Sequence, residues 1–196
     1  MPLIPTPIEI PKTLTIQIDD REKYPLLFPD YITIDHPYQL GGQTKIRITT
    51  QPHRLNAGDY RLLEYPDCCI VERKGSQSEV IKNLFNPSDS VRQGKALLKL
   101  VKACTHPVLL LEVSPSKLLS PSGFMVGWEP DVLIHRITKI IANYNLQVLW
   151  LPQPASPSAR RHLGTTILHL MLTYALIPYD AHSFPQDEPL CSENTK

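Results

Sequence analysis

The sequence predicts an α/β fold in which helices flank a mixed β-sheet. The first half of the chain holds short segments that alternate apolar and polar residues, as half-buried strands do. The second half alternates apolar runs of the buried-strand type, at 107–113 and 146–151, with segments of helical periodicity. An antiparallel start followed by a strand–helix–strand–helix order builds a mixed sheet with helices against it.

Each expected element follows from its own pattern. Strands are expected at 14–19, 45–50, 59–63 and 68–74, with a loop at 35–45 that contains Gly41 and Gly42. From Ser76 the period becomes helical, and Ser76 with Glu79 forms a capping box at the start of a helix over 76–85. Further helices are expected at 90–104, 131–144 and 159–176.

Length and composition indicate one compact domain. The chain has 196 residues, 42% of them hydrophobic, and its 20 prolines cut it into short elements. We expect a proline-rich arm at 1–12, the domain at 13–178 and a disordered tail at 179–196. The formal charge of +1 means that any nucleic-acid contact must come from a local basic patch.

The cysteines and the apolar runs indicate a soluble intracellular protein. The four cysteines form no CxxC pair and have no histidines at zinc-site spacing, as expected in a reducing compartment. The location would be cytoplasmic for a bacterial or phage source and nuclear for a eukaryotic one. The run from 163 to 178 is too short and too polar for a membrane span, so a buried or interface helix is expected and no membrane contact.

Two carboxylates are expected to meet across a hairpin. If 59–63 and 68–74 pair through the loop 64–67, Asp59 lies opposite Glu72, and Lys74 shares their face while Arg73 points to the other. Like charges roughly 5 Å apart repel, so a divalent cation between them is the natural candidate. Oxygen ligands for Mg²⁺ beside a lysine suit phosphodiester hydrolysis.

A structural alternative explains the same residues. The hairpin end can be solvated, with Asp59 and Glu72 paired to Arg61 and Lys74 and no metal between them. Because hairpin register is itself an inference, spacing alone leaves the metal site and the ion-pair interpretation both open.

A combined motif resembles a known family. The stretch "VERK" is preceded by "GD" at 58–59 and, further upstream, by "IDDRE" at 18–22. This pattern is similar to that of the nuclease domain of XPF-type structure-specific endonucleases, which include the Mus-type and Hef nucleases. The resemblance runs from about Ile16 to about Pro154, about two-thirds of the chain. It implies a restriction-endonuclease-like mixed sheet with flanking helices and a metal-dependent DNA endonuclease activity with Mg²⁺ or Mn²⁺.

The resemblance also implies roles for individual residues. Asp59 and Glu72 would be the metal-binding carboxylates and Lys74 the catalytic lysine. The other matching positions are Asp19 and Glu22 as supporting acids, Arg21 near the phosphate, Arg73 in the middle of the triplet, and Arg92 as a basic residue early in the second helix.

This sequence departs from the family pattern at two places. The family has an aspartate four residues after the lysine, where this chain has Ser78 and, one residue later, Glu79. We expect Glu79 to substitute for that aspartate after a one-residue insertion. Tandem helix-hairpin-helix modules often follow the nuclease domain in the family, and residues 155–196 are too few and too apolar to supply them.

Two surfaces suggest partners. Arg92, Lys95, Lys99 and Lys102 recur at intervals of three and four, which makes one basic stripe that either contacts DNA phosphates or forms a solvated outer face. The last helix has more apolar positions than one core-facing stripe needs, and family members pair through their nuclease domains. A homodimer, or a heterodimer with a related subunit, is therefore expected.

The leading hypothesis is a metal-dependent DNA endonuclease that acts on branched or duplex DNA. The rival hypothesis is a catalytically silent DNA-binding or scaffolding subunit, because such members occur in the family. The intact "GD" and "ERK" motifs argue against the rival.

Overall fold

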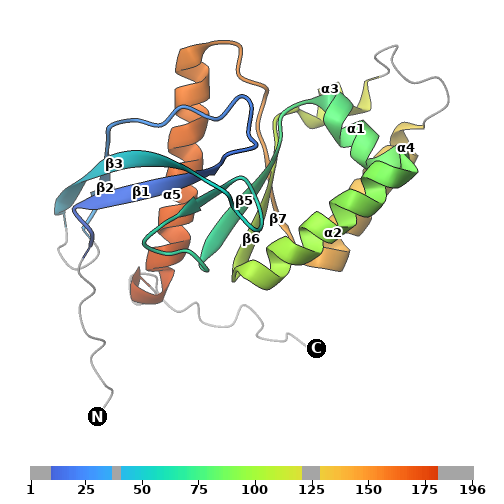
Figure 1. The fold of residues 1–196 in the computed structure, drawn as a ribbon. Coiled ribbons are helices and arrows are strands. Elements are labelled where there is room, and N and C mark those ends of the chain that lie inside the picture. Colours follow the sequence, from blue (N-terminus) through green and yellow to red (C-terminus); the bar gives the residue numbers. More distant parts are fainter. Residues whose placement is uncertain (1–9, 37–40, 121–128, 181–196) are drawn as a thin grey trace, which may run out of the picture.

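A seven-stranded mixed sheet forms the centre of the molecule (Figure 1). The computed structural model describes residues 10–36, 41–120 and 129–180, without the side chains of 177–180. The sheet order is β2-β3-β1-β4-β5-β6-β7. In chain order the strands are β1 (Thr13–Asp19), β2 (Tyr31–Asp35), β3 (Gln43–His53), β4 (Tyr60–Leu62), β5 (Cys69–Lys74), β6 (His106–Leu111) and β7 (Gln147–Trp150).

The sheet joins a largely antiparallel half to a parallel half. β2 pairs antiparallel with β3, and β4 pairs antiparallel with both β1 and β5. β5, β6 and β7 are parallel, because helices connect them. β1 and β3 are also parallel, so the expectation of a purely antiparallel start was wrong at this pair.

Helices cover the two faces of the sheet in different places (Figure 1). They are α1 (Gln77–Phe85), α2 (Pro87–Ala103), α3 (Pro115–Leu119), α4 (Pro130–Tyr144) and α5 (Pro157–Asp180). One core lies between α5 and strands β1 to β6, and a second lies between α1, α2, α4 and the parallel strands. α5 therefore supports the back of the sheet, and α2 crosses the front near β5.

α5 is held closely against the rest of the chain. Ile167, Leu168 and Leu172 are almost fully buried in the first core. At Gly164 the helix approaches the chain so closely that a Cβ there would lie 2.1 Å from the carbonyl oxygen of Leu27. Only glycine permits this approach without a shift of the backbone. The wide apolar face of the last helix is thus used mainly inside the chain.

Most expected elements are present with shifted ends. The mixed sheet with flanking helices is confirmed, and the expected strands and helices all appear within a few residues of their expected bounds. β2 and α3 were not expected. The loop expected at 35–45 was too wide, because β2 includes Asp35 and β3 begins at Gln43. The expected arm at 1–12 and tail at 179–196 lie largely outside the described residues.

No helix in the described part of the chain has the length and apolar character needed to cross a membrane.

Candidate active site

The β4–β5 hairpin has the register that the sequence predicts. Arg61 lies opposite Ile70 and Tyr60 opposite Val71. Gly58 precedes the hairpin with φ 66°, and a Cβ there would lie 2.4 Å from the Ile70 side chain. Glycine is needed because the left-handed conformation and the close approach both exclude a larger residue. The hairpin ladder ends before Asp59, whose N–H donates to the carbonyl of Val71 at 2.8 Å.

Asp59 is held at the front of the sheet by the backbone of β5. Its Oδ2 accepts a hydrogen bond from the Arg73 N–H at 2.7 Å, and no described residue donates to its Oδ1. Burial, followed by the nearby charge of Glu72, raises the pKa of Asp59 to about 8. Burial and the charge of Glu72 therefore both disfavour a negative charge on Asp59.

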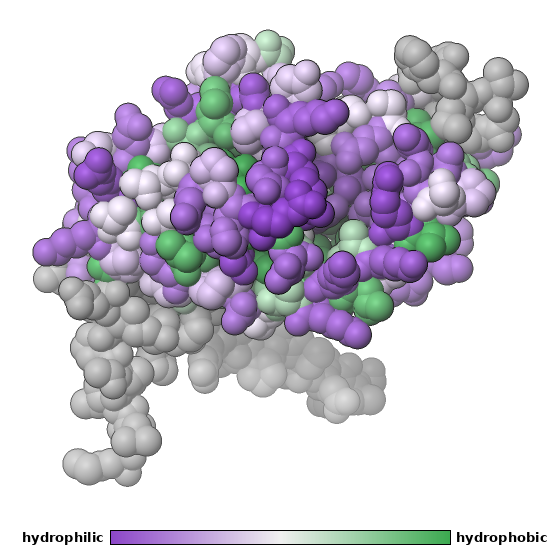
Figure 2. All heavy atoms as spheres, viewed as in Figure 1, coloured by the Kyte–Doolittle hydropathy of each residue, from purple (hydrophilic) through white to green (hydrophobic). Residues whose placement is uncertain are grey.

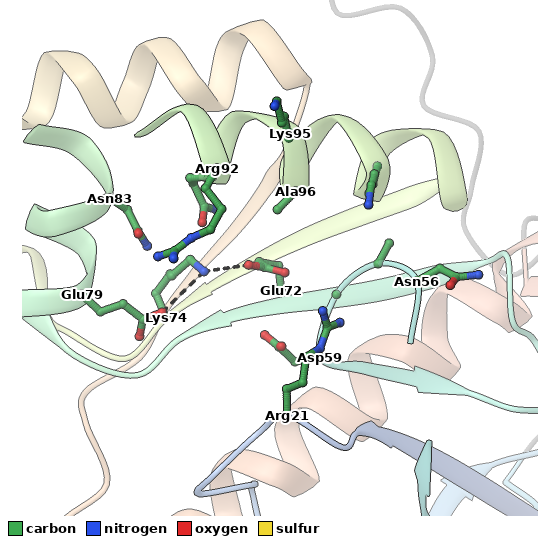
Figure 3. A pocket seen from close by; sticks show the side chains of 14 residues that line it. Arg21, Asn56, Asp59, Glu72, Lys74, Glu79, Asn83, Arg92, Lys95 and Ala96 are labelled. Carbon is green, nitrogen blue, oxygen red and sulfur yellow. Dashed lines mark hydrogen bonds and ion pairs between the residues drawn. The ribbon is translucent and has the colours of Figure 1, made fainter. Parts of the chain in front are cut away.

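Glu72 and Lys74 form a buried ion pair beside Asp59 (Figure 3). Lys74 Nζ donates to Glu72 Oε1 at 2.7 Å, and no donor among the described residues reaches Glu72 Oε2. Burial alone would lower the pKa of Lys74, but the charge of Glu72 and its hydrogen bond raise it. Lys74 is therefore a fixed cation. The pairing of Glu72 with Lys74 agrees with the ion-pair alternative, whereas Arg61 binds Gln17 and not Asp59.

These side chains line the floor of a cleft of about 450 Å³. α2 lies along the opposite wall, and Arg92 reaches from it toward Lys74, whereas Lys95 points away from the carboxylates (Figure 3). The surrounding surface is mostly hydrophilic (Figure 2). The charged residues that line the cleft are Arg21, Asp59, Glu72, Lys74, Glu79, Arg92, Lys95 and Lys99.

The basic stripe on α2 faces the cleft and not only solvent. Arg92, Lys95 and Lys99 line it, and Lys102 lines an adjoining hollow. Arg92 is oriented by a hydrogen bond of 2.6 Å to Asp89, which is buried at the start of α2. The stripe thus supplies positive charge above the two carboxylates.

Glu79 combines a capping contact with an ion pair. The N–H of Glu79 donates to Ser76 Oγ at 3.2 Å, as the capping box predicts. Glu79 Oε2 accepts from the N–H of Gly75 at 3.0 Å, and Oε1 lies 3.5 Å from Lys74 Nζ. Glu79 therefore lines the cleft and pairs there with Lys74. It does not join Asp59 and Glu72 in a three-carboxylate cluster, so a direct ligand role for Glu79 is not supported.

Asp19 lies behind the cleft and fixes Arg21. Asp19 is buried, and its two oxygens accept hydrogen bonds of 2.6 Å and 2.8 Å from the Arg21 guanidinium. Burial alone would raise the pKa of Asp19, but the hydrogen bonds from Arg21 and from the Leu55 N–H lower it. Arg21 itself is exposed and lines the cleft, where it is available to an anion.

Glu22 and Arg73 lie on the other side of β5, outside the cleft. Arg73 donates to both oxygens of Glu112, at 2.5 Å and 2.8 Å, and to Glu22 at 3.0 Å. The alternation of side chains in a strand places Arg73 on this side, as the sequence predicts. A role for Glu22 and Arg73 around the reacting atoms stays a prediction. Arg73 reaches Asp59 only through its backbone N–H.

Sequence reasoning missed several polar residues of this region, including Asn56 and Gln93, which line the cleft. Asn83 on α1 is buried and lines the cleft. Glu112 is 1% exposed and anchors Arg73. Glu112 follows an apolar run, and an acid there is itself a signal, because a charge so placed needs a partner.

Asp59 and Glu72 are the residues that could hold a divalent cation in this cleft. Among the described residues no three His, Cys, Asp or Glu side chains gather closely enough to hold a metal. Mg²⁺ needs only one or two carboxylates, because it keeps several of its waters. Asp59 and Glu72 each have one oxygen to which no described residue donates a hydrogen bond.

Comparison with solved structures shows the same fold elsewhere. The structure of XPF from Aeropyrum pernix in complex with DNA matches with a TM-score of 0.50 at 19% identity, over 89% of this chain and 68% of that one. A second structure of XPF from the same organism matches with a TM-score of 0.49 at 18% identity, over 92% and 70%. No protein-family model and no curated protein sequence matches. The match to the DNA-complexed structure confirms the expected fold, a mixed sheet with flanking helices.

Proposed function

We propose that this chain is a divalent-metal-dependent DNA endonuclease that hydrolyses phosphodiester bonds in branched or duplex DNA. One observation carries the proposal: two carboxylates and a buried lysine lie on the floor of a cleft whose opposite wall is basic. A phosphodiester is an anion that needs a cation at its reacting oxygens, and this cleft has two carboxylates that could hold a metal ion beside positively charged side chains. The fold shared with XPF, a protein solved in complex with DNA, supports the same assignment.

Asp59 and Glu72 would hold the ion through their free oxygens. A bound Mg²⁺ or Mn²⁺ would polarise the phosphate and lower the pKa of a bound water. The Arg73 N–H fixes the other oxygen of Asp59, and Lys74 fixes the other oxygen of Glu72. Each carboxylate is thus oriented by one hydrogen bond and keeps one oxygen for the cation.

Lys74 and Arg21 would act on the phosphate directly. Lys74 keeps its charge because Glu72 and Glu79 flank it, and its ammonium group faces the same cleft. It can orient the phosphate and offset the negative charge that develops in the transition state. Arg21, held by buried Asp19, presents a guanidinium at the same opening. Asp19 is then a positioning residue rather than a metal ligand.

A cleavage assay tests the proposal. The purified chain is incubated with labelled forked, flapped and linear DNA in Mg²⁺, in Mn²⁺ and in chelator. We expect cleavage only with metal, and its abolition by Asp59→Asn or Glu72→Gln with little change in DNA binding. Asp131→Asn removes an exposed carboxylate on α4 and is the matched control, which should cleave normally.

Two results would contradict the assignment. Cleavage that survives both carboxylate variants would place the reacting centre elsewhere. DNA binding without cleavage on every substrate and with either metal would instead support the silent-subunit hypothesis.

A further inference from the structure

A second hollow continues the cleft along α2. This hollow has a volume of about 620 Å³, and it shares Asn56 and Ala57 with the cleft. In Figure 3, Asn56 lies at the end of the cleft away from Glu79. A chain-like ligand that leaves the carboxylates in this direction would therefore pass from the cleft into the second hollow.

Two cations line the second hollow from different elements. Arg61 projects from β4, and Lys102 lies near the end of α2. Lys102 is the next member of the stripe after Lys99, which lines the cleft. Asp67 is the acidic residue that lines the hollow, and it forms no ion pair with either cation in the described part of the chain. Positive charge thus exceeds negative charge here.

Arg61 is held in place without being neutralised. Its Nε donates to Gln17 Oε1 at 2.8 Å, and Gln17 is 4% exposed and bonded to Gln51. No described residue accepts a hydrogen bond from the two terminal nitrogens of Arg61. A guanidinium fixed at Nε by a neutral amide keeps its charge and two pairs of donors, which is the arrangement that a phosphate needs.

The distance between basic residues along α2 indicates how many nucleotides the cleft and the second hollow together could span. Arg92 and Lys102 are ten residues apart on the helix, which corresponds to about 15 Å at the usual rise per residue. That distance matches about four base steps of B-DNA. Arg61 follows Asp59 by two residues, about 7 Å along an extended chain. A strand with one phosphate at the carboxylates therefore brings another phosphate to Arg61 and Lys102 within about two to four nucleotides.

We propose that Arg61 and Lys102 form a second phosphate-binding position for the DNA strand that occupies the cleft. The proposal rests on the proposed function, and it adds a contact to one side of the reacting phosphate. It assigns phosphate binding to Arg61. The sequence does not suggest this role, because an arginine on the surface of a sheet is commonly only solvated.

The first test measures DNA binding in chelator, so that no cleavage occurs. Arg61→Gln keeps a hydrogen-bonding side chain beside Gln17 but removes the charge. We expect weaker binding and a salt-dependence slope smaller by about one unit, as when one phosphate is no longer neutralised. The matched control is Arg161→Gln, because Arg161 is an exposed arginine on α5, the helix packed against the other core. It should leave the slope unchanged.

A second test locates the contact on the DNA. Single phosphates of the substrate are replaced by uncharged methylphosphonates, one position at a time. In the wild type, a replacement about two to four steps from the cleavage position, on one side of it, should weaken binding. In Arg61→Gln combined with Lys102→Gln, that same replacement should have no further effect, while replacements elsewhere keep theirs.

The outcomes separate this inference from the proposed function. If the wild type binds DNA with a salt-dependent affinity and Arg61→Gln binds with the same affinity and slope, the second position is wrong and the nuclease assignment stands. If the weakening in Arg61→Gln is equal at every methylphosphonate position, the position is also wrong. If the wild type itself shows no DNA binding, the proposed function fails first.

Discussion

Asp59 is a carboxyl whose surroundings oppose its charge. Its folded-state pKa is raised from 3.8 to about 8, by burial first and by Glu72 second. Between about pH 4 and pH 8 the folded protein therefore holds a proton that the unfolded chain has released. The metal-free protein loses stability as pH rises through this window. Below about pH 4 Asp59 is protonated in both the folded and the unfolded state. At low pH, therefore, the charge of Asp59 does not reduce the stability of the folded protein.

Asp59→Asn should remove this pH dependence. At pH 8 without metal, we expect the variant to melt a few degrees above the wild type, since 1 kcal/mol corresponds to about 2–4 °C in a domain of this size. At pH 5 the difference should be small. Thermal melting at the two pH values checks this, and Mn²⁺ should raise the melting temperature of the wild type only. A variant that melts well below the wild type at pH 8 would mark Asp59 as a structural ion-pair residue.

Glu79 offers a second prediction at the scale of one residue. Glu79→Gln keeps an oxygen for the N–H of Gly75 but removes the charge beside Lys74. We expect a reduction of roughly ten- to a hundredfold in activity or metal affinity, the range for residues that orient a metal site, with little change in stability. Steady-state cleavage and calorimetric Mn²⁺ binding measure these. Near-normal values would confine Glu79 to capping the helix, a contribution of about 1 kcal/mol.

The strand β5 shows how one element separates two tasks. Glu72 and Lys74 point into the cleft, while Arg73 between them points to Glu112 and Glu22. The alternation of side chains in a strand was enough to predict this division from the sequence. The partner Glu112 was not predictable in the same way, because it lies 39 residues further along the chain and only the pairing of β5 with β6 brings it close.

Local patterns explain which other elements could be predicted. The helices α1, α2 and α4 have strong periodicity, and β6 and β7 are continuous apolar runs, so their expected places are confirmed. β6 is buried as expected, but β7 is an edge strand and only half-buried. β2 has only five residues and was missed. Its place in the sheet depends on pairing with β3, and the residues of β2 alone do not indicate that pairing. The parallel pairing of β1 with β3 is likewise a long-range arrangement that no local signal indicates.

The basic stripe on α2 carries a prediction about this helix as a unit. If Lys95 and Lys99 contact phosphates, changing both to alanine should weaken binding to all DNA sequences alike and reduce the salt slope by about one for each lysine that neutralises a phosphate. The helix itself should persist, because both side chains are exposed and alanine favours helices. Fluorescence anisotropy across a salt series measures the slope. If the salt-dependence slope of DNA binding is unchanged, Lys95 and Lys99 do not contact phosphates and only face solvent.

At the scale of the whole molecule, the two faces of the sheet have different tasks. The core under α5 packs against β1, β4 and their neighbours and leaves the front of the hairpin free. The second core, under α1, α2 and α4, fixes the helix that carries the basic stripe. The cleft lies between the hairpin, which the first core supports, and α2, which the second core supports. Its geometry therefore depends on both cores and not on the motif residues alone.

The apolar surface of α5 bears on the expected dimer. The sequence suggested that this helix has more apolar residues than its own core needs. In the structure, the buried residues of α5 in the first core are Leu163, Ile167, Leu168, Met171, Leu172 and Leu176. The dimer stays a prediction of the family resemblance, to be measured as a mass by light scattering at micromolar concentration. These six residues, however, are not its interface.

Leu172→Glu distinguishes a core position from an interface position. Leu172 is 1% exposed, and a carboxylate there would be buried without a partner, so we expect loss of the cooperative melting transition. Thr173→Glu introduces the same charge at the exposed neighbouring position and should fold normally. Circular dichroism melting and light scattering are measured on both variants. If Leu172→Glu instead gives a well-folded protein of half the wild-type mass, α5 pairs two chains, and its place in the core of one chain must be revised.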